Sequence, residues 1–189
     1  ILQKLIAQNK TNSGNRTDEQ TYPDFRQSKT GAADNLESKT HLTPEIMNRE
    51  NYVQLVDEQD NPVGVMEKMA AHRHPVLHRA ISVFIVNSAG EWLIHQRNGN
   101  KYHSAGLWTN ACCTHPYEGE SYVDAANRRL HEEMGMTCRL TPMFHFIYKA
   151  RIDDELTEYE YDQVFLAVTD EEPQPNEDEV KDWKYISFK

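Results

Sequence analysis

The stretch LWTNACCTHP, at residues 107–116, is followed three residues later by ESYVDAANRRLHEEMG, at residues 120–135. The first part places a thiol and an imidazole two residues apart, at Cys113 and His115. The second part is rich in paired charges and has the apolar spacing of a helix. We interpret the rest of the chain as segments that support this helix or that contribute side chains to a site around the Cys113 thiol.

The helix is the best-marked element of the chain, and we predict it over residues 121–134. Ser121 can cap its start, with the Asp124 carboxylate three residues on. Gly135 fits the left-handed position that ends a helix. An apolar stripe at helical spacing is formed by Val123, Ala126, Leu130 and Met134.

The segments on either side alternate in hydrophobicity and are separated by turn residues, which is typical of strands. We predict strands at residues 52–56, 63–67, 80–86, 92–96, 143–150, 157–168 and 180–186. A loop with His72, His74 and His78 follows the second strand, since Pro75 excludes a continuous helix through them. Many strands with one clear helix predict an α+β fold, a mixed β-sheet packed between helices.

Length and charge limit the classes of function. A chain length of 189 residues predicts one domain. The formal net charge of −10 argues against a nucleic-acid or membrane-surface role. An anionic substrate is compatible with this charge if a local cluster of Lys and Arg, or a metal, holds it. No apolar run approaches the roughly 18–20 residues of a transmembrane helix.

The N-terminal quarter has a different composition from the rest. Residues 1–46 are rich in Asn, Thr, Ser, Gln and Lys and lack any sustained period, so we expect a disordered or non-native extension. We expect Met47 to be the natural start and residues 47–189 to form the domain. The odd number of cysteines, three, favours reduced thiols in a cytoplasmic protein.

The charges of the helix allow two interpretations. The pairs Arg128/Glu132 and Arg129/Glu133 are spaced i, i+4, and such pairs usually form a solvated, salt-bridged face. Together with Glu120 before the helix, however, the same charges resemble the Nudix box, G-x5-E-x7-R-E-U-x-E-E-x-G-U (U apolar). That box cradles a metal–diphosphate complex with helix carboxylates.

Two departures from the box are informative. Thr114 stands where the box has its first Gly, and Arg129 stands where it has the Glu after Arg. In Nudix hydrolases that Glu is a metal ligand. A guanidinium removes an oxygen ligand and adds positive charge, which disfavours hydrolysis but not diphosphate binding.

The stretch from Trp108 to Pro116 closely resembles the catalytic loop of type I isopentenyl-diphosphate delta-isomerases, a family with the Nudix fold. The resemblance extends over about residues 50–187. It implies metal-dependent isomerisation of isopentenyl diphosphate to dimethylallyl diphosphate, in isoprenoid biosynthesis. The catalytic residues that it implies are Cys113, Glu160 and Tyr148.

The same resemblance implies ligands and substrate contacts. The first metal, Mn²⁺ or Zn²⁺, would be held by His72, His78, His115, Glu158 and Glu160. A second ion, Mg²⁺, would be held by Glu133 and the substrate diphosphate. The substrate contacts would be Lys68, Arg97, Lys101, Arg129 and Trp108. The implied partner is this small diphosphate alone, and we expect a monomer.

The reaction adds a proton to one alkene carbon and removes one from another, so it needs an acid and a base on opposite faces of the allylic unit. Cys113 and Glu160 are the two candidates, and the sequence leaves open which of them is the acid. Cys112 is the alternative thiol, and Cys113 is preferred because it occupies the family's catalytic position. Cys113 also has a simpler interpretation, as a small buried apolar residue.

The residue types agree with a metal site. Positions 158 and 160 of a strand point to the same face, and two carboxylates so close repel unless a cation or a proton lies between them. The competing interpretation is an exposed acidic strand edge, because Asp162 continues that face. His74 competes with His72 as the ligand. The remaining histidines are expected to be surface or core residues: His41, His95, His103, His131 and His145.

The end of the sequence carries a further expectation. The family closes its pocket with a C-terminal helix bearing a Trp, whereas this sequence ends at Lys189 with tryptophans at 92, 108 and 183. We therefore expect a domain truncated at its C-terminus, with weak or absent turnover and retained metal binding. The alternatives are a Nudix pyrophosphohydrolase acting on a nucleoside diphosphate derivative, and a structural zinc module, whose cysteine spacing is wrong.

Overall fold

The structure is a computed structural model, and it describes residues 49–99 and 104–187. The predicted extension at 1–46, the predicted start at Met47 and the predicted phosphate contact Lys101 lie outside the described residues. No helix in the described ranges has the length and hydropathy needed to cross a bilayer.

Nine strands in these ranges form one mixed sheet around β3 (His78–Val86). β3 pairs antiparallel with β1, β4 and β6 and parallel with β8, while β7 extends the sheet beside β8 and β9 beside β4. The other strands are β1 (Tyr52–Val56), β2 (Pro62–Glu67), β4 (Glu91–Arg97), β5 (Trp108–Asn110), β6 (Cys112–Thr114), β7 (Thr141–Arg151), β8 (Thr157–Val168) and β9 (Val180–Ser187). The predicted mixed sheet of an α+β fold is confirmed.

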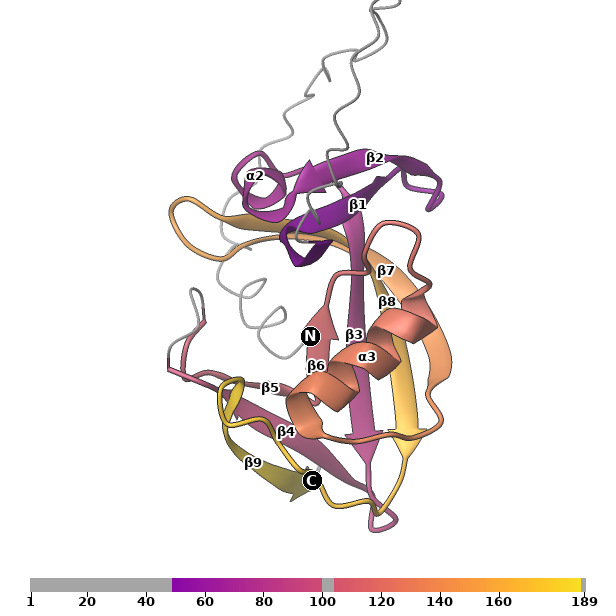
Figure 1. Cartoon of the computed structure of the whole chain (residues 1–189), viewed down its shortest axis with the longest axis vertical. Helices are drawn as coiled ribbons and strands as arrows, with labels where there is room; N and C mark the ends of the chain where they lie inside the picture. The colour runs from indigo at the N-terminus through magenta and orange to yellow at the C-terminus, as the bar shows by residue number, and fades with distance from the viewer. Residues whose placement is uncertain (1–48, 100–103, 188–189) are drawn as a thin grey trace, which may run out of the picture.

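The pairing of β3 with β8 positions the rest of the molecule. The two strands run side by side down the centre (Figure 1), and nine consecutive residue pairs join them, from His78 with Glu160 to Val86 with Val168. β3 is buried along most of its length, as expected for a central strand covered on both faces. This register brings a histidine and a carboxylate from distant parts of the chain next to each other.

Helix α3 (Tyr122–Met134) begins and ends at the predicted caps. The Ser121 hydroxyl accepts a hydrogen bond from the Asp124 backbone N–H at 3.2 Å. Gly135 has a φ of 63°, and a Cβ added there would collide with the Gln174 backbone. A glycine is therefore required at position 135 both for its backbone conformation and for its lack of a side chain.

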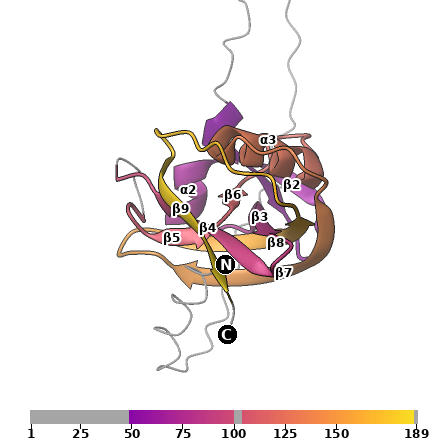
Figure 2. The ribbon, with the colours of Figure 1, turned by 90° about the horizontal axis from the view of Figure 1, so that it is seen from below.

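The apolar face of α3 packs on β3 and β6, and the view from below shows the helix on one side of the sheet (Figure 2). Leu130 and Met134 are fully buried there. Val123, predicted to belong to the same stripe, is instead 41% exposed, because the buried face runs through Ala125 and Ala126 and leaves Val123 at its edge.

The core under α3 yields a prediction for stability. Replacing Leu130 by Ala should lower the free energy of unfolding by about 3 kcal/mol, because it removes a fully buried side chain and leaves a cavity. Denaturant titration measures this change. The control is Val123→Ala on the same helix, which should cost less than about 1 kcal/mol; equal losses for both variants would contradict the packing described here.

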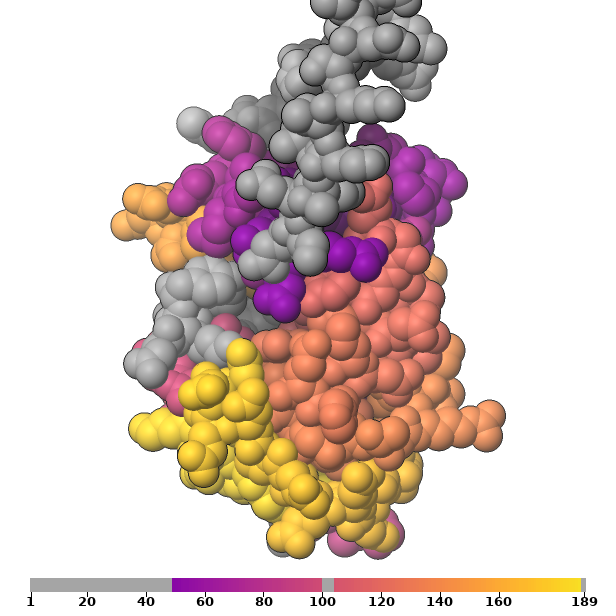
Figure 3. All heavy atoms as spheres, viewed as in Figure 1, coloured from indigo at the N-terminus to yellow at the C-terminus, as the bar shows by residue number. Residues whose placement is uncertain are grey.

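The acidic loop after β8 docks on the end of α3. The Gln174 N–H donates to the Met134 carbonyl at 2.8 Å, and the Asn176 N–H donates to the Glu133 carbonyl at 2.9 Å. In the space-filling view the C-terminal part of the chain, in yellow, lies directly against the helix surface, in orange (Figure 3). This contact brings Glu179, at the end of the loop, beside Arg129.

The segment after β2 differs from the prediction of a loop. Residues Lys68–Arg73 form a short helix, α2, and the Glu67 carboxylate caps it by accepting from the Met69 and Ala70 N–H groups at 2.9 and 2.7 Å. Pro75 excludes only a continuous helix through all three histidines, so a helix that ends before it is compatible. A turn of 3₁₀-helix (Arg49–Asn51) precedes β1.

Candidate active site

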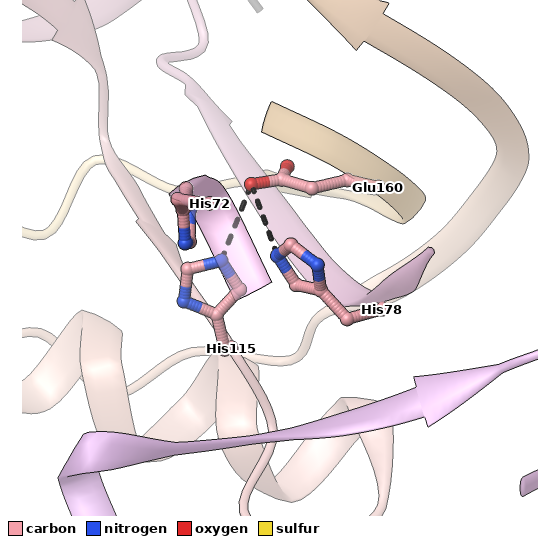
Figure 4. A group of neighbouring side chains, drawn as sticks. All are labelled: His72, His78, His115 and Glu160. Carbon is pink, nitrogen blue, oxygen red and sulfur yellow. Dashed lines mark hydrogen bonds and ion pairs between the residues drawn. The ribbon is translucent and has the colours of Figure 1, made fainter. Parts of the chain in front are cut away.

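Three imidazoles and one carboxylate meet at the upper end of the central strands. His78 is on β3, Glu160 on β8 and His72 on α2, while His115 follows β6 directly. One ligand atom from each residue lies within 4.8 Å of every other, and Figure 4 shows the three rings gathered around the carboxylate. Glu160 Oε1 lies 3.2 Å from His115 Nε2 and 3.9 Å from His78 Nε2.

The backbone fixes the tautomer of two of these rings. The Nδ1 atoms of His72 and His78 lie 2.6 and 2.7 Å from the carbonyl oxygens of Lys68 and Val76. A carbonyl oxygen only accepts, so each Nδ1 carries a hydrogen, and in the neutral ring each Nε2 keeps its lone pair. Burial lowers the pKa of His115 to about 3, despite the opposing effect of Glu160, so this ring is also neutral.

These four side chains fit a divalent metal ion. Imidazole nitrogens with their second nitrogen fixed by a carbonyl, together with one carboxylate, form a donor set suited to Mn²⁺ or Zn²⁺. The group contains His72 and leaves out His74. Within the described ranges it contains no cysteine either, so nothing here supports a structural zinc module at Cys112 and Cys113.

Tyr148 contacts both carboxylates of the site, Glu158 and Glu160. Its hydroxyl lies 2.5 Å from Glu160 Oε2 and 2.8 Å from Glu158 Oε2, so it stands between the two carboxylates, and its one hydrogen is donated to Glu160, the nearer of them. Burial, and then the negative charges of Glu160 and Glu158, raise the pKa of Tyr148 well above its ordinary value. Glu160 and Asp162 are 2% and 0% exposed, which excludes the interpretation of this strand as an exposed acidic edge.

The two adjacent cysteines face opposite sides of β6. Cys112 is fully buried in the hydrophobic core, where burial raises the pKa of its thiol well above the ordinary value. Cys113 is partly exposed and lines a cavity. Strand alternation therefore separates the two thiols, one into the packing and one into the site.

One cavity of about 570 Å³ joins the thiol to the carboxylates and to a basic cluster. The predicted site residues that line it are Lys68, His72, Arg97, Cys113, His115, Arg129, Glu133, Glu158 and Glu160. His78 and Tyr148 lie just behind this wall, in contact with Glu160. Trp108 is outside the lining, with its ring 4.2 Å from Lys184 Nζ.

Arg129 organises the end of the cavity next to α3. Its guanidinium pairs with Glu133 at 2.5 Å and with Glu179 at 2.6 Å. Glu133 is 2% exposed, and burial raises the pKa of its carboxyl group against the lowering effect of Arg129. At the position where the Nudix box has a carboxylate, this chain therefore has the positive charge of Arg129, which is paired with Glu133 and Glu179.

His95 is a site residue that the sequence reasoning missed. It is 1% exposed, lines the cavity and has its Nε2 3.9 Å from Glu133 Oε2. Burial lowers its pKa to about 4, so the ring is neutral. Strand alternation is the signal that could have found it, because positions 95 and 97 share a face and Arg97 was already a candidate.

The Nudix domain model matches residues 76–189 of this chain. A solved protein from Deinococcus radiodurans has the same fold, with a TM-score of 0.60, 21% sequence identity and coverage of 72% of this chain and 83% of that one. The fold and the charged helix at the cavity therefore define a Nudix-domain protein.

More similar relatives show to which family within the Nudix-domain class the chain belongs. The isopentenyl-diphosphate Delta-isomerase of Pectobacterium atrosepticum is 53% identical over 136 residues, which is 72% of this chain and 76% of the relative. Isopentenyl-diphosphate Delta-isomerase 1 of Aromatoleum aromaticum is 51% identical over 139 residues, 74% of this chain and 78% of the relative. The chain belongs to the isopentenyl-diphosphate Delta-isomerase family.

Proposed function

We propose that this protein interconverts isopentenyl diphosphate and dimethylallyl diphosphate, in isoprenoid biosynthesis. The observation that carries the proposal is that Cys113 and Glu160 reach one cavity from β6 and β8, with basic side chains on the same wall. A C₅ diphosphate has a small apolar end and a highly charged end, and the cavity offers groups for each.

The proton transfers are carried out by Cys113 and Glu160. One group adds a proton to the terminal alkene carbon, the double bond moves, and the other removes a proton from the neighbouring allylic carbon. No atom is gained or lost, and the same pair runs the reverse reaction with exchanged roles. The Tyr148 hydroxyl donates to Glu160 and so holds the carboxylate in place.

The charged end of the substrate would be bound beside α3. Lys68, Arg97 and Arg129 all line the cavity, and guanidinium groups bind phosphate oxygens in pairs. Lys101 is proposed to join them. Glu133 would hold Mg²⁺ together with the substrate diphosphate, since Mg²⁺ prefers carboxylate and phosphate oxygens.

A first divalent ion, Mn²⁺ or Zn²⁺, would be held by His72, His78, His115, Glu158 and Glu160. When bound, it would supply positive charge beside Glu160 and stabilise the ionised carboxylate. We propose that the protein works in the reducing cytoplasm, where Cys113 stays a thiol; its three free cysteines support this. We propose that it acts as a monomer.

Metal binding has a readout apart from turnover. Adding Mn²⁺ at a hundred times its dissociation constant should stabilise the protein by about 2.7 kcal/mol, which raises the melting temperature by about 5–10 °C. His72→Ala should lose most of this shift, and chelation should reverse it. His131→Ala, on the exposed face of α3, is the control and should keep the full shift; a loss in both variants would contradict the assigned site.

The product distinguishes the two candidate activities. Isopentenyl diphosphate is incubated with the protein, Mg²⁺ and Mn²⁺, and the mixture is examined for the allylic isomer and for released phosphate. The proposal expects the isomer with no phosphate, and slow formation of the isomer is sufficient to distinguish the two activities. Released phosphate without isomer would favour a Nudix pyrophosphohydrolase, an activity that Arg129 disfavours because it stands where the Nudix box has a metal-ligating Glu.

A further inference from the structure

Behind the proposed proton-transferring thiol lies a buried serine and carboxylate. Ser82 on β3 is paired with Cys113 on β6, and Ala80, two residues earlier on the same face, is paired with Asp162 on β8. Ser82 and Asp162 are each 0% exposed. Neither lines the cavity, so any effect on the reaction passes through a neighbouring side chain and not through direct contact with substrate.

The direction of the hydrogen bonds follows from the number of hydrogens. The Ser82 hydroxyl donates its one hydrogen to Asp162 Oδ2, at 2.9 Å. Ser82 Oγ also lies 3.5 Å from Cys113 Sγ. Because the hydroxyl hydrogen is already used, Ser82 can only accept from the thiol.

Asn110 presents a second acceptor to the same sulfur. Its amide nitrogen donates to the carbonyl oxygens of Val83 and Cys112, at 3.0 and 2.9 Å, and these bonds fix the orientation of the amide. Asn110 Oδ1 therefore faces Cys113 Sγ, 3.3 Å away. It also accepts from the Thr109 hydroxyl at 3.0 Å, which holds it further in place.

We propose that Ser82, oriented by Asp162, and Asn110 are positioning residues for Cys113. The thiol has one hydrogen, so at any moment it donates to Ser82 Oγ or to Asn110 Oδ1, and the two acceptors together hold Sγ at the cavity wall. The sulfur therefore faces the alkene carbon from a fixed position. This inference rests on the proposed role of Cys113 in proton transfer. It assigns a function to Asp162, the carboxylate that continues the Glu158 and Glu160 face but is excluded from the cavity.

Measuring kcat and KM separately distinguishes a role of Ser82 in positioning the thiol from a role in binding substrate. Ser82→Ala should lower kcat about ten- to hundredfold, because small displacements of a reacting group are costly, while KM changes less than about twofold. Ser82→Thr keeps the hydroxyl and should retain most of the turnover. The Mn²⁺-dependent rise in melting temperature should survive in both, since neither touches the metal ligands. An unchanged kcat in a folded Ser82→Ala protein would overturn the proposal.

A double variant tests whether Asp162 acts on Cys113 through Ser82. Asp162→Asn should lower kcat in the same direction, and Ser82→Ala/Asp162→Asn should be no slower than Ser82→Ala alone, because Asp162 acts through Ser82. Multiplying losses would overturn this route. That outcome would indicate a separate effect through Tyr148, whose pKa is also raised by Asp162.

The infrared S–H stretch reports the contact without any turnover. The band of Cys113 is identified as the one missing from Cys113→Ala, and the Cys112 band is the internal control. Ser82→Ala leaves Asn110 Oδ1 as the remaining one of the two acceptors. It should therefore change the frequency or width of the Cys113 band and leave the Cys112 band in place; an unchanged Cys113 band would overturn the proposal. If the unchanged protein made no isomer yet the band moved, the proposed function would fail while the positioning stood.

Discussion

Glu160→Gln is expected to abolish isomer formation, with a loss of at least about 10³-fold, and to weaken Mn²⁺ binding together with it. The carboxylate is buried, contacts Tyr148 and His115, and belongs both to the proposed metal group and to the proton-transferring pair. Glutamine keeps the shape but removes the charge and the ability to take up a proton. Product formation and calorimetric Mn²⁺ titration measure the two losses.

The matched control for this variant is Glu155→Gln. It makes the same chemical change on an exposed carboxylate in the turn just before β8. Turnover and Mn²⁺ affinity should both stay within about twofold of the unchanged protein. If Glu160→Gln kept its Mn²⁺ affinity while losing turnover, Glu160 would be a proton-transferring group but not a ligand.

Cys113→Ala should also lose isomer formation by about 10³-fold or more, but should bind Mn²⁺ as the unchanged protein does. The thiol lines the cavity but is not among the four side chains that gather at the metal site. Turnover and the Mn²⁺-dependent melting shift, measured on the same sample, separate these two properties.

Cys112→Ala is the control that the sequence itself provides. Its thiol lies in the core, so the variant should keep turnover while losing about 1 kcal/mol of stability from the smaller side chain. Loss of turnover in Cys112→Ala with retention in Cys113→Ala would reverse the assignment of the two thiols.

Local patterns in the sequence were sufficient for the elements whose stabilisation is local. The helix α3 was predicted with both caps, because Ser121 and Gly135 act on the turn next to them. The first hairpin and the long strand β8 were predicted from alternation and turn residues. The Nudix fold followed from the resemblance rather than from these patterns, and the comparisons confirm it.

Short elements and contacts between distant residues cannot be predicted from local sequence patterns. β5 and β6 have three residues each, too few to show a period, so the local pattern predicts a loop there. Helix α2 has six residues and depends on the Glu67 cap, a contact that hydrophobic periodicity does not reveal. The register of β3 against β8 joins residues 82 positions apart, so the contacts made by Ser82 and Asp162 could not be foreseen.

The account depends on a thiol and a carboxylate that work from different strands on one bound C₅ diphosphate. The most direct test is the rate at which deuterium from D₂O enters the methyl groups of dimethylallyl diphosphate made by this protein, followed by NMR over long incubation. We predict incorporation that requires a divalent metal and is lost in Cys113→Ala and in Glu160→Gln. Incorporation at an equal rate in either variant would contradict the account.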